Sequence, residues 1–168
     1  MAESLWFYGL EPRWFGWDRL FKVHVLSDGV AGAYLAAQVY DEQSGRMQLI
    51  APAGIAGPLM ALWVRQLVRR RAERESFYDS LVPGAPEFMA ADTRNFFLPV
   101  DDVEEVAVSR KRSLWTAGVS NSGSVRFFLR SGGQRRFVLV NEQNLEKIER
   151  ALIGSLGESR VNRPDKDA

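Results

Sequence analysis

Cysteine is absent from the 168-residue chain, and histidine occurs once, as His24. The missing cysteine excludes a disulfide framework, a thiolate metal site and a cysteine nucleophile. The single histidine excludes a multi-histidine metal cluster. Neither sign of charge is in excess, because 22 Lys and Arg oppose 21 Asp and Glu. A net charge of +1 gives no field that would recruit nucleic acid or an acidic substrate to the whole molecule. We expect a soluble, cytoplasmic globular domain.

Lysine is scarce, with four lysines against 18 arginines. Arginine suits phosphate and carboxylate recognition because its planar fork donates two parallel hydrogen bonds. A coding bias toward arginine in the source genome explains the same skew. The skew alone therefore assigns no function, and only local clusters of arginine are informative.

Sequence motifs of catalysis are also missing. The chain has no Gly-x-Ser-x-Gly elbow, no Gly-x-Gly-x-x-Gly and no phosphate-binding loop. His24 stands between Val23 and Val25 in an expected strand, where a hydrogen-bonded structural role is favoured. Residues 101–105 hold four acids without the spacing of a calcium loop, which favours a solvated turn. We expect no catalytic residue, cofactor or metal; a small-molecule enzyme stays open, because paired carboxylates need not be neighbours in sequence.

One long run, Met47–Val64, carries no charge over 18 residues, and arginines follow it. Pro52 and Pro58 interrupt the run, and 18 helical residues reach only about 27 Å against a hydrocarbon core of about 30 Å. A membrane span is therefore not expected. Contact with a membrane surface stays open.

A helix is expected from Pro58 to about Leu81, because proline favours the first helical turn. Its apolar residues, Trp63 among them, fall within one arc, and Arg70, Arg71 and Arg74 fall inside the same arc. A helix of 24 residues is about 36 Å long, whereas a seven-residue strand spans about 23 Å. We expect the middle or end of the helix to overhang the sheet, where the arginines meet water, a second protomer or an anionic partner. Pairing with acidic residues of the same chain is the alternative.

Residues 1–19 are dense in aromatic side chains and contain Gly9, Pro12 and Gly16. This composition predicts an irregular segment held against a core, with an interfacial membrane anchor as the alternative. A hairpin follows, with a strand from Leu20 to Leu26, a turn at Asp28-Gly29 and a strand over residues 30–40. The second strand is rich in alanine, which predicts a helix crossing close to it.

The second half of the chain predicts four strands and a helix. The strands are expected at residues 95–98, 103–112, 124–130 and 135–140, and the helix, capped by Asn141, at 145–156. In the last hairpin we expect the following residues to share the outer face: Arg126, Phe128, Arg130, Arg135 and Phe137. Such a face could stack bases and contact phosphates, but an edge kept soluble by arginine is the simpler interpretation. Residues 157–168 are polar and are expected to be disordered.

The segments Phe96–Val103, Val125–Val140 and Leu145–Leu156 together resemble a bacterial pleckstrin-homology-like (PH-like) domain. The resemblance is one of pattern over about half of the chain. It implies an α+β fold, an antiparallel split barrel closed by a C-terminal helix, as one domain over residues 1–156 with a helical insertion at 57–94. It also implies a non-catalytic module that binds lipid headgroups, peptides or a partner domain. Eukaryotic members bind phosphoinositides around the first hairpin loop; we take that loop to be Ser27–Gly29, which is acidic and short, so the lipid role is not carried over.

We therefore expect a non-enzymatic interaction or scaffold module that binds a protein partner or associates with itself as a dimer. The alternative is peripheral binding to an anionic membrane at its inner face, through the arginine-bearing helix or the aromatic N-terminus. Nucleic acid is not an expected partner. The candidate interaction surface comprises Arg70, Arg71, Arg74, Trp63, Arg126, Arg130, Arg135 and Phe128.

Overall fold

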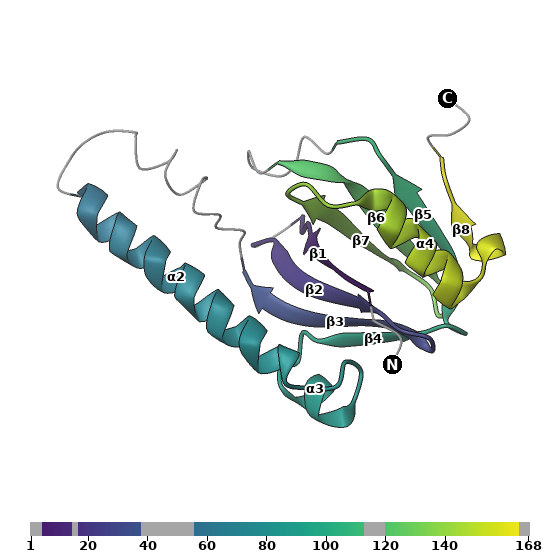
Figure 1. Cartoon of the computed structure of the whole chain (residues 1–168), viewed down its shortest axis with the longest axis horizontal. Coiled ribbons are helices and arrows are strands. Elements are labelled where there is room, and N and C mark those ends of the chain that lie inside the picture. The colour runs from purple at the N-terminus through teal and green to yellow at the C-terminus, as the bar shows by residue number, and fades with distance from the viewer. Residues whose placement is uncertain (1–4, 15–16, 38–55, 113–119, 165–168) are drawn as a thin grey trace.

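The computed structural model describes residues 5–14, 17–37, 56–112 and 120–164, and only the backbone of residues 56–61 and 64. Its strands are β1 (Leu5–Glu11), β2 (Arg19–Val25), β3 (Gly29–Ala36), β4 (Phe96–Pro99), β5 (Val103–Ser109), β6 (Asn121–Leu129), β7 (Gln134–Val140) and β8 (Val161–Asn162). Its helices are α2 (Ala56–Asp79), α3 (Pro86–Ala90) and α4 (Leu145–Leu156), with a 3-10 turn, η1 (Glu158–Arg160). The strands form one sheet in the order β4-β3-β2-β1-β7-β6-β5-β8 (Figure 1). The expected α+β fold, with a mostly antiparallel sheet and a C-terminal helix, is confirmed.

The N-terminal strand β1 occupies the middle of this sheet, between β2 and β7. The expectation of an irregular segment over residues 1–19 is therefore wrong for Leu5–Glu11. Glycine misled the prediction: Gly9 pairs with Leu139 of β7, and a Cβ at Gly9 would lie 2.8 Å from the Cβ of Phe137. Glycine here permits the close approach of β7, which joins the two halves of the sheet.

Two cores lie on opposite faces of the strands β1–β3. The first is built around phenylalanines that pack mostly edge to face, and it is closed by the apolar side of α4: Phe7, Phe21, Phe96, Phe127, Phe137, Ile148 and Leu152. The second lies under α2 and α3, where Tyr78 and Phe88 pack against Ala31 and Ala33 of β3. The predicted approach of a helix to the alanine-rich strand is confirmed. Burial on both faces explains why β2 and β3 carry so few exposed residues.

Along the chain, helix α2 follows β3 and precedes β4. It begins two residues before the predicted start. Its last turns pack on the sheet, and its first turns run past the end of the sheet (Figure 1). The expectation of an overhang toward the end of the helix is therefore wrong, because the overhang is at the N-terminal part. The predicted apolar stripe is only partly correct, because Tyr78 is buried but Phe77 is 52% exposed. Among the described residues no helix is long and apolar enough to cross a membrane.

The C-terminal tail is ordered up to Pro164, against the prediction of disorder from residue 157. Strand β8 pairs in parallel with β5 through Val106 and Val161, and Arg163 forms an ion pair with Glu149 of α4. The tail was misjudged because a two-residue strand and one ion pair leave no apolar pattern. The cap of α4 was also misplaced: Asn144, not Asn141, accepts a hydrogen bond from the Lys147 N–H. Residues 165–168, 38–55 and 113–119 lie outside the described part of the chain.

Candidate functional site

Some arginines of α2 contact other residues of the protein, and others face solvent. Arg70 is exposed and has no ion pair with a described residue. Arg71 lies 5.2 Å above the ring of Tyr8, and Arg74 lies 3.6 Å from the carboxylate of Asp92. Arg94 also binds Asp92, and its hydrogen bond is the main reason why the pKa of that carboxyl is low. Internal pairing, the alternative left open by the sequence, thus applies to Arg74, while Arg70 is available to a partner.

The predicted outer face of the β6–β7 hairpin is not a single face. Val125 pairs with Phe137 and Phe127 with Arg135, so Phe137 and Arg135 lie on the inner side, away from Arg126 and Phe128. A register that differs by one residue from the expected one moves a whole strand to the opposite face. Arg126 lies 5.8 Å from the ring of Phe128, and Arg130 is exposed in the following turn.

Arg135 is a core-edge residue rather than part of an interaction surface. Its guanidinium lies 3.7 Å from the centre of the Phe96 ring and 2.8 Å from Glu11 of β1. Burial lowers the pKa of Arg135, and the charge of Glu11 opposes that shift. Its position fixes the end of β1 against β7, and we remove it from the candidate surface.

The first hairpin of the sheet is β1–β2, and its loop comprises residues 12–18. This corrects the earlier assignment of Ser27–Gly29, which form the turn between β2 and β3. The true first loop carries Arg13, Trp14 and Trp17. Pro12 and Gly16, two turn-forming residues between alternating segments, indicated this hairpin in the sequence. The many aromatic residues around them favoured an irregular segment instead.

An exposed tryptophan of this loop, Trp17, lies beside an exposed tryptophan of α2, Trp63. Trp17 and Trp63 line a hollow of about 260 Å³ with Leu67 and Arg71 of α2 and with Ala36 and Ala37 at the end of β3. The exposed fractions are 89% for Trp14, 67% for Trp17 and 48% for Trp63. Leu62 and Arg65 are exposed beside Trp63 on the helix. We call this surface, formed by Arg13, Trp14, Trp17, Leu62, Trp63 and Arg65, the tryptophan–arginine end.

A second hollow, of about 1270 Å³, opens beside Trp14 and is bordered mainly by arginine. Arg13 and Arg19 come from the loop and from β2, and Arg136 comes from β7. In the described part of the chain none of these three forms an ion pair, and the Nε of Arg136 is buried without a hydrogen-bond partner. Two acids also line this hollow: Glu11 forms an ion pair with Arg135, and Asp18 accepts the backbone N–H of Arg13. The local charge is therefore positive although the molecule is close to neutral.

A buried charge cluster lies on β1 and β2, at the other end of α2. Lys22, only 4% exposed, lies 2.6 Å from Asp79 and 3.1 Å from Glu75, and Tyr8 donates its hydroxyl to Glu75. Burial and this hydrogen bond raise the pKa of Tyr8. His24, predicted to be hydrogen-bonded, has no partner at either ring nitrogen among the described residues. Its pKa falls to about 4, first because of burial and then because of the charge of Lys22.

No group of three or more His, Asp or Glu among the described residues could hold a metal ion. The features that could bind a partner are thus the tryptophan–arginine end and the surface above the buried cluster. Comparison with known proteins adds no relative to these observations: no family model, no curated protein and no solved structure matches the chain.

Proposed function

We propose that this protein is a non-catalytic PH-like interaction module that binds anionic membrane surfaces through the tryptophan–arginine end. The observation that carries the proposal is the exposure of Trp14 and Trp17 on the β1–β2 loop, with Trp17 beside Trp63 of α2, together with arginines that form no ion pair with a described residue. Support for the PH-like assignment comes from the strand order, in which β1–β4 and β5–β7 form two antiparallel meanders joined at β1 and β7. Helix α4 closes the core between them, and α2 with α3 is the insertion.

The exposed side chains suit the boundary between lipid headgroups and hydrocarbon. Tryptophan prefers this boundary because its ring is large and apolar and its indole N–H can still reach water. Trp14 and Trp17 lie between β1 and β2, and Trp17 lines one hollow with Trp63 of α2. Exposed apolar side chains that are grouped on one surface are typical of a site that contacts a partner or a membrane.

The charge of the same surface decides between a membrane and a second copy of the chain. Arg13 and Arg65 are exposed there, and neither forms an ion pair with a described residue. Two such surfaces placed face to face would repel each other, whereas anionic headgroups attract them at about 1 kcal/mol for each basic residue near the surface. An anionic membrane is therefore the occupant that fits both the apolar and the charged groups.

Co-sedimentation with lipid vesicles tests the proposal. We expect binding to vesicles of phosphatidylcholine with about 30 mol% phosphatidylserine, and much weaker binding to phosphatidylcholine alone. The double substitution Trp14→Ala and Trp17→Ala should weaken binding by at least about tenfold, because two large apolar side chains no longer leave water. Raising the salt concentration to about 0.5 M should weaken the remaining electrostatic part.

Phe77→Ala is the matched control, because Phe77 is also an exposed aromatic residue but lies near the other end of α2. This variant should bind vesicles as the unsubstituted protein does. Equal binding by the Trp14/Trp17 variant, or binding that ignores the lipid charge, would overturn the proposal.

Self-association through the outward side of α2 is the second candidate. It is favoured by the exposure of Leu62, Trp63 and Phe77 along one helix, at 62%, 48% and 52%. Light scattering over a range of protein concentrations tests it.

A further inference from the structure

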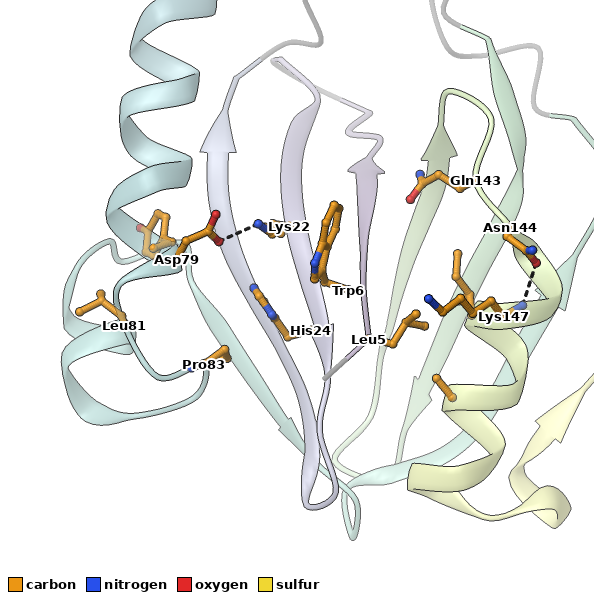
Figure 2. A pocket seen from close by; sticks show the side chains of 13 residues that line it. Leu5, Trp6, Lys22, His24, Asp79, Leu81, Pro83, Gln143, Asn144 and Lys147 are labelled. Carbon is orange, nitrogen blue, oxygen red and sulfur yellow. Dashed lines mark hydrogen bonds and ion pairs between the residues drawn. The ribbon is translucent and has the colours of Figure 1, made fainter. Parts of the chain in front are cut away.

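A groove of about 1000 Å³ runs across β1 and β2, between the end of α2 and the first turns of α4. Figure 2 shows its floor, made by Leu5, Trp6 and His24, and its two walls. Leu81 and Pro83 border it after α2, and Lys147 borders it on α4. The groove is separate from the tryptophan–arginine end, since Leu5 and Glu11 stand at opposite ends of a strand of about 20 Å.

The backbone of β1 is open toward this groove. The Tyr8 N–H donates to Gln143 Oε1 at 2.9 Å, and Gln143 Nε2 donates to the Tyr8 carbonyl at 2.7 Å. The backbone groups of Tyr8 therefore point away from β2. In an antiparallel pair the direction alternates along the strand, so the N–H and C=O of Trp6 point the same way. Strand β7 pairs only with Gly9 and Leu10. Within the described ranges nothing hydrogen-bonds to the Trp6 backbone on that side.

The side chain of Trp6 is held in place although it is 45% exposed. The ammonium of Lys22 lies 4.4 Å from its ring centre, and Lys22 is itself fixed by Glu75 and Asp79. An exposed ring held on a rigid support is suited to binding, because little conformational entropy is lost when a ligand covers it. Beside it, His24 is buried, with 6% of its surface exposed. Neither of its ring nitrogens has a hydrogen-bond partner among the described residues.

Among the charged residues that line this groove, Lys147 is the one left for a ligand. Asp79 is bound to Lys22, whereas Lys147 has no ion pair with a described residue. Figure 2 shows Lys147 extending from α4 toward β1. A ligand with a negative group could therefore reach Lys147 while the rest of it lies along Trp6.

We propose that this groove binds an extended acidic peptide segment of a partner protein. One residue of the peptide pairs with the N–H and C=O of Trp6, which extends the sheet locally by strand addition. An apolar side chain of the peptide covers the Trp6 ring, and a neighbouring Asp or Glu binds Lys147. A peptide of this composition offers three kinds of group. Its backbone can pair with that of Trp6, its apolar side chain can cover the Trp6 ring, and its carboxylate can bind Lys147.

Selection from a random peptide library displayed on phage tests the proposal on the full chain. The enriched peptides should combine an acidic residue with an aromatic or long aliphatic residue close by. A synthetic peptide of the enriched sequence should bind with an affinity that falls at least about tenfold for Lys147→Glu, because attraction becomes repulsion. Arg150→Glu, on the same helix but outside the groove lining, is the matched control and should bind normally.

The backbone contact has its own readout, which does not depend on a substituted protein. The Trp6 amide should exchange with solvent quickly in the free protein and slowly in the complex, as measured by nuclear magnetic resonance. N-methylation of the peptide at the paired residue should abolish this protection. The proposal would be overturned if the library yielded no enriched peptide or yielded basic peptides. It would also be overturned if Lys147→Glu left binding unchanged, or if the Trp6 amide stayed unprotected in the complex.

Discussion

His24 is a buried histidine without hydrogen-bond partners, and it makes the stability of the protein depend on pH. Its pKa is about 4 in the folded chain against an ordinary value of 6.5, with burial as the main cause and Lys22 as the second. Asp79 opposes the shift but does not cancel it. Between these pH values the unfolded chain takes up a proton that the folded chain does not. The stability from this residue is therefore complete above pH 6.5 and is lost as the pH falls toward 4.

Replacing His24 with leucine should remove this pH dependence. The unsubstituted protein should lose up to about 1.4 kcal/mol for each pH unit over this range, and His24→Leu should lose much less. Urea unfolding at several pH values measures the difference. Asp92 gives an internal reference: its pKa lies below 3.8, so the stability that it adds is lost only at still lower pH. An identical slope in both proteins between pH 6.5 and 4 would exclude His24 as the cause.

Among the elements, those with turn signals at both ends could be predicted from the sequence. Strands β2 to β7 and the bounds of α2 follow from Asp28-Gly29, Gly132-Gly133 and Pro58 to within a few residues. Strand β1 could not be predicted, because its glycine serves packing rather than a turn. The β6–β7 register could not either, because a loop around two adjacent glycines is compatible with more than one pairing. That uncertainty placed Arg135 on the wrong surface.

The tail after α4 is the element whose contribution is easiest to measure. Glu149 is 6% exposed and forms its ion pair with Arg163, while Arg160 donates to the Val100 carbonyl at 2.5 Å. Ending the chain at Gly157 should destabilise the fold by about 3 kcal/mol, because a buried carboxylate loses its partner. Adding Glu149→Leu to the shortened chain should recover much of this loss. Urea unfolding of the two shortened chains checks this, and equal stability of both would contradict it.

For the whole molecule, near-neutral charge conceals an uneven distribution. The sequence could identify the arginines of α2 as a cluster, but not that Arg71 and Arg74 turn inward while Arg70 faces solvent. It could not show that the loop at residues 12–18 meets α2, since Trp17 and Trp63 are 46 positions apart in the printed sequence. Contacts between distant segments depend on topology, which local patterns do not specify. The sequence thus indicated the arginine-bearing helix and the aromatic N-terminus as separate alternatives, and it could not show that they meet.

Self-association, the second candidate proposed above, would use the outward side of α2. Trp63 and Phe77 each stand seven residues from Arg70, so two antiparallel helices with a two-fold axis at Arg70 would bring each tryptophan beside the partner's phenylalanine. The two Arg70 side chains would repel each other, and Glu73 is already paired with Arg69 at 2.8 Å, so the apolar contacts would have to outweigh this repulsion. This second candidate predicts that light scattering shows a mass rising with concentration from 19.0 kDa toward twice that value. Phe77→Glu should hold the mass at one chain by placing a charge in the contact, whereas Val82→Glu, also exposed but beyond the helix, should not. A constant single-chain mass in the unsubstituted protein would exclude the dimer and leave the membrane as the sole partner proposed for this end of the molecule.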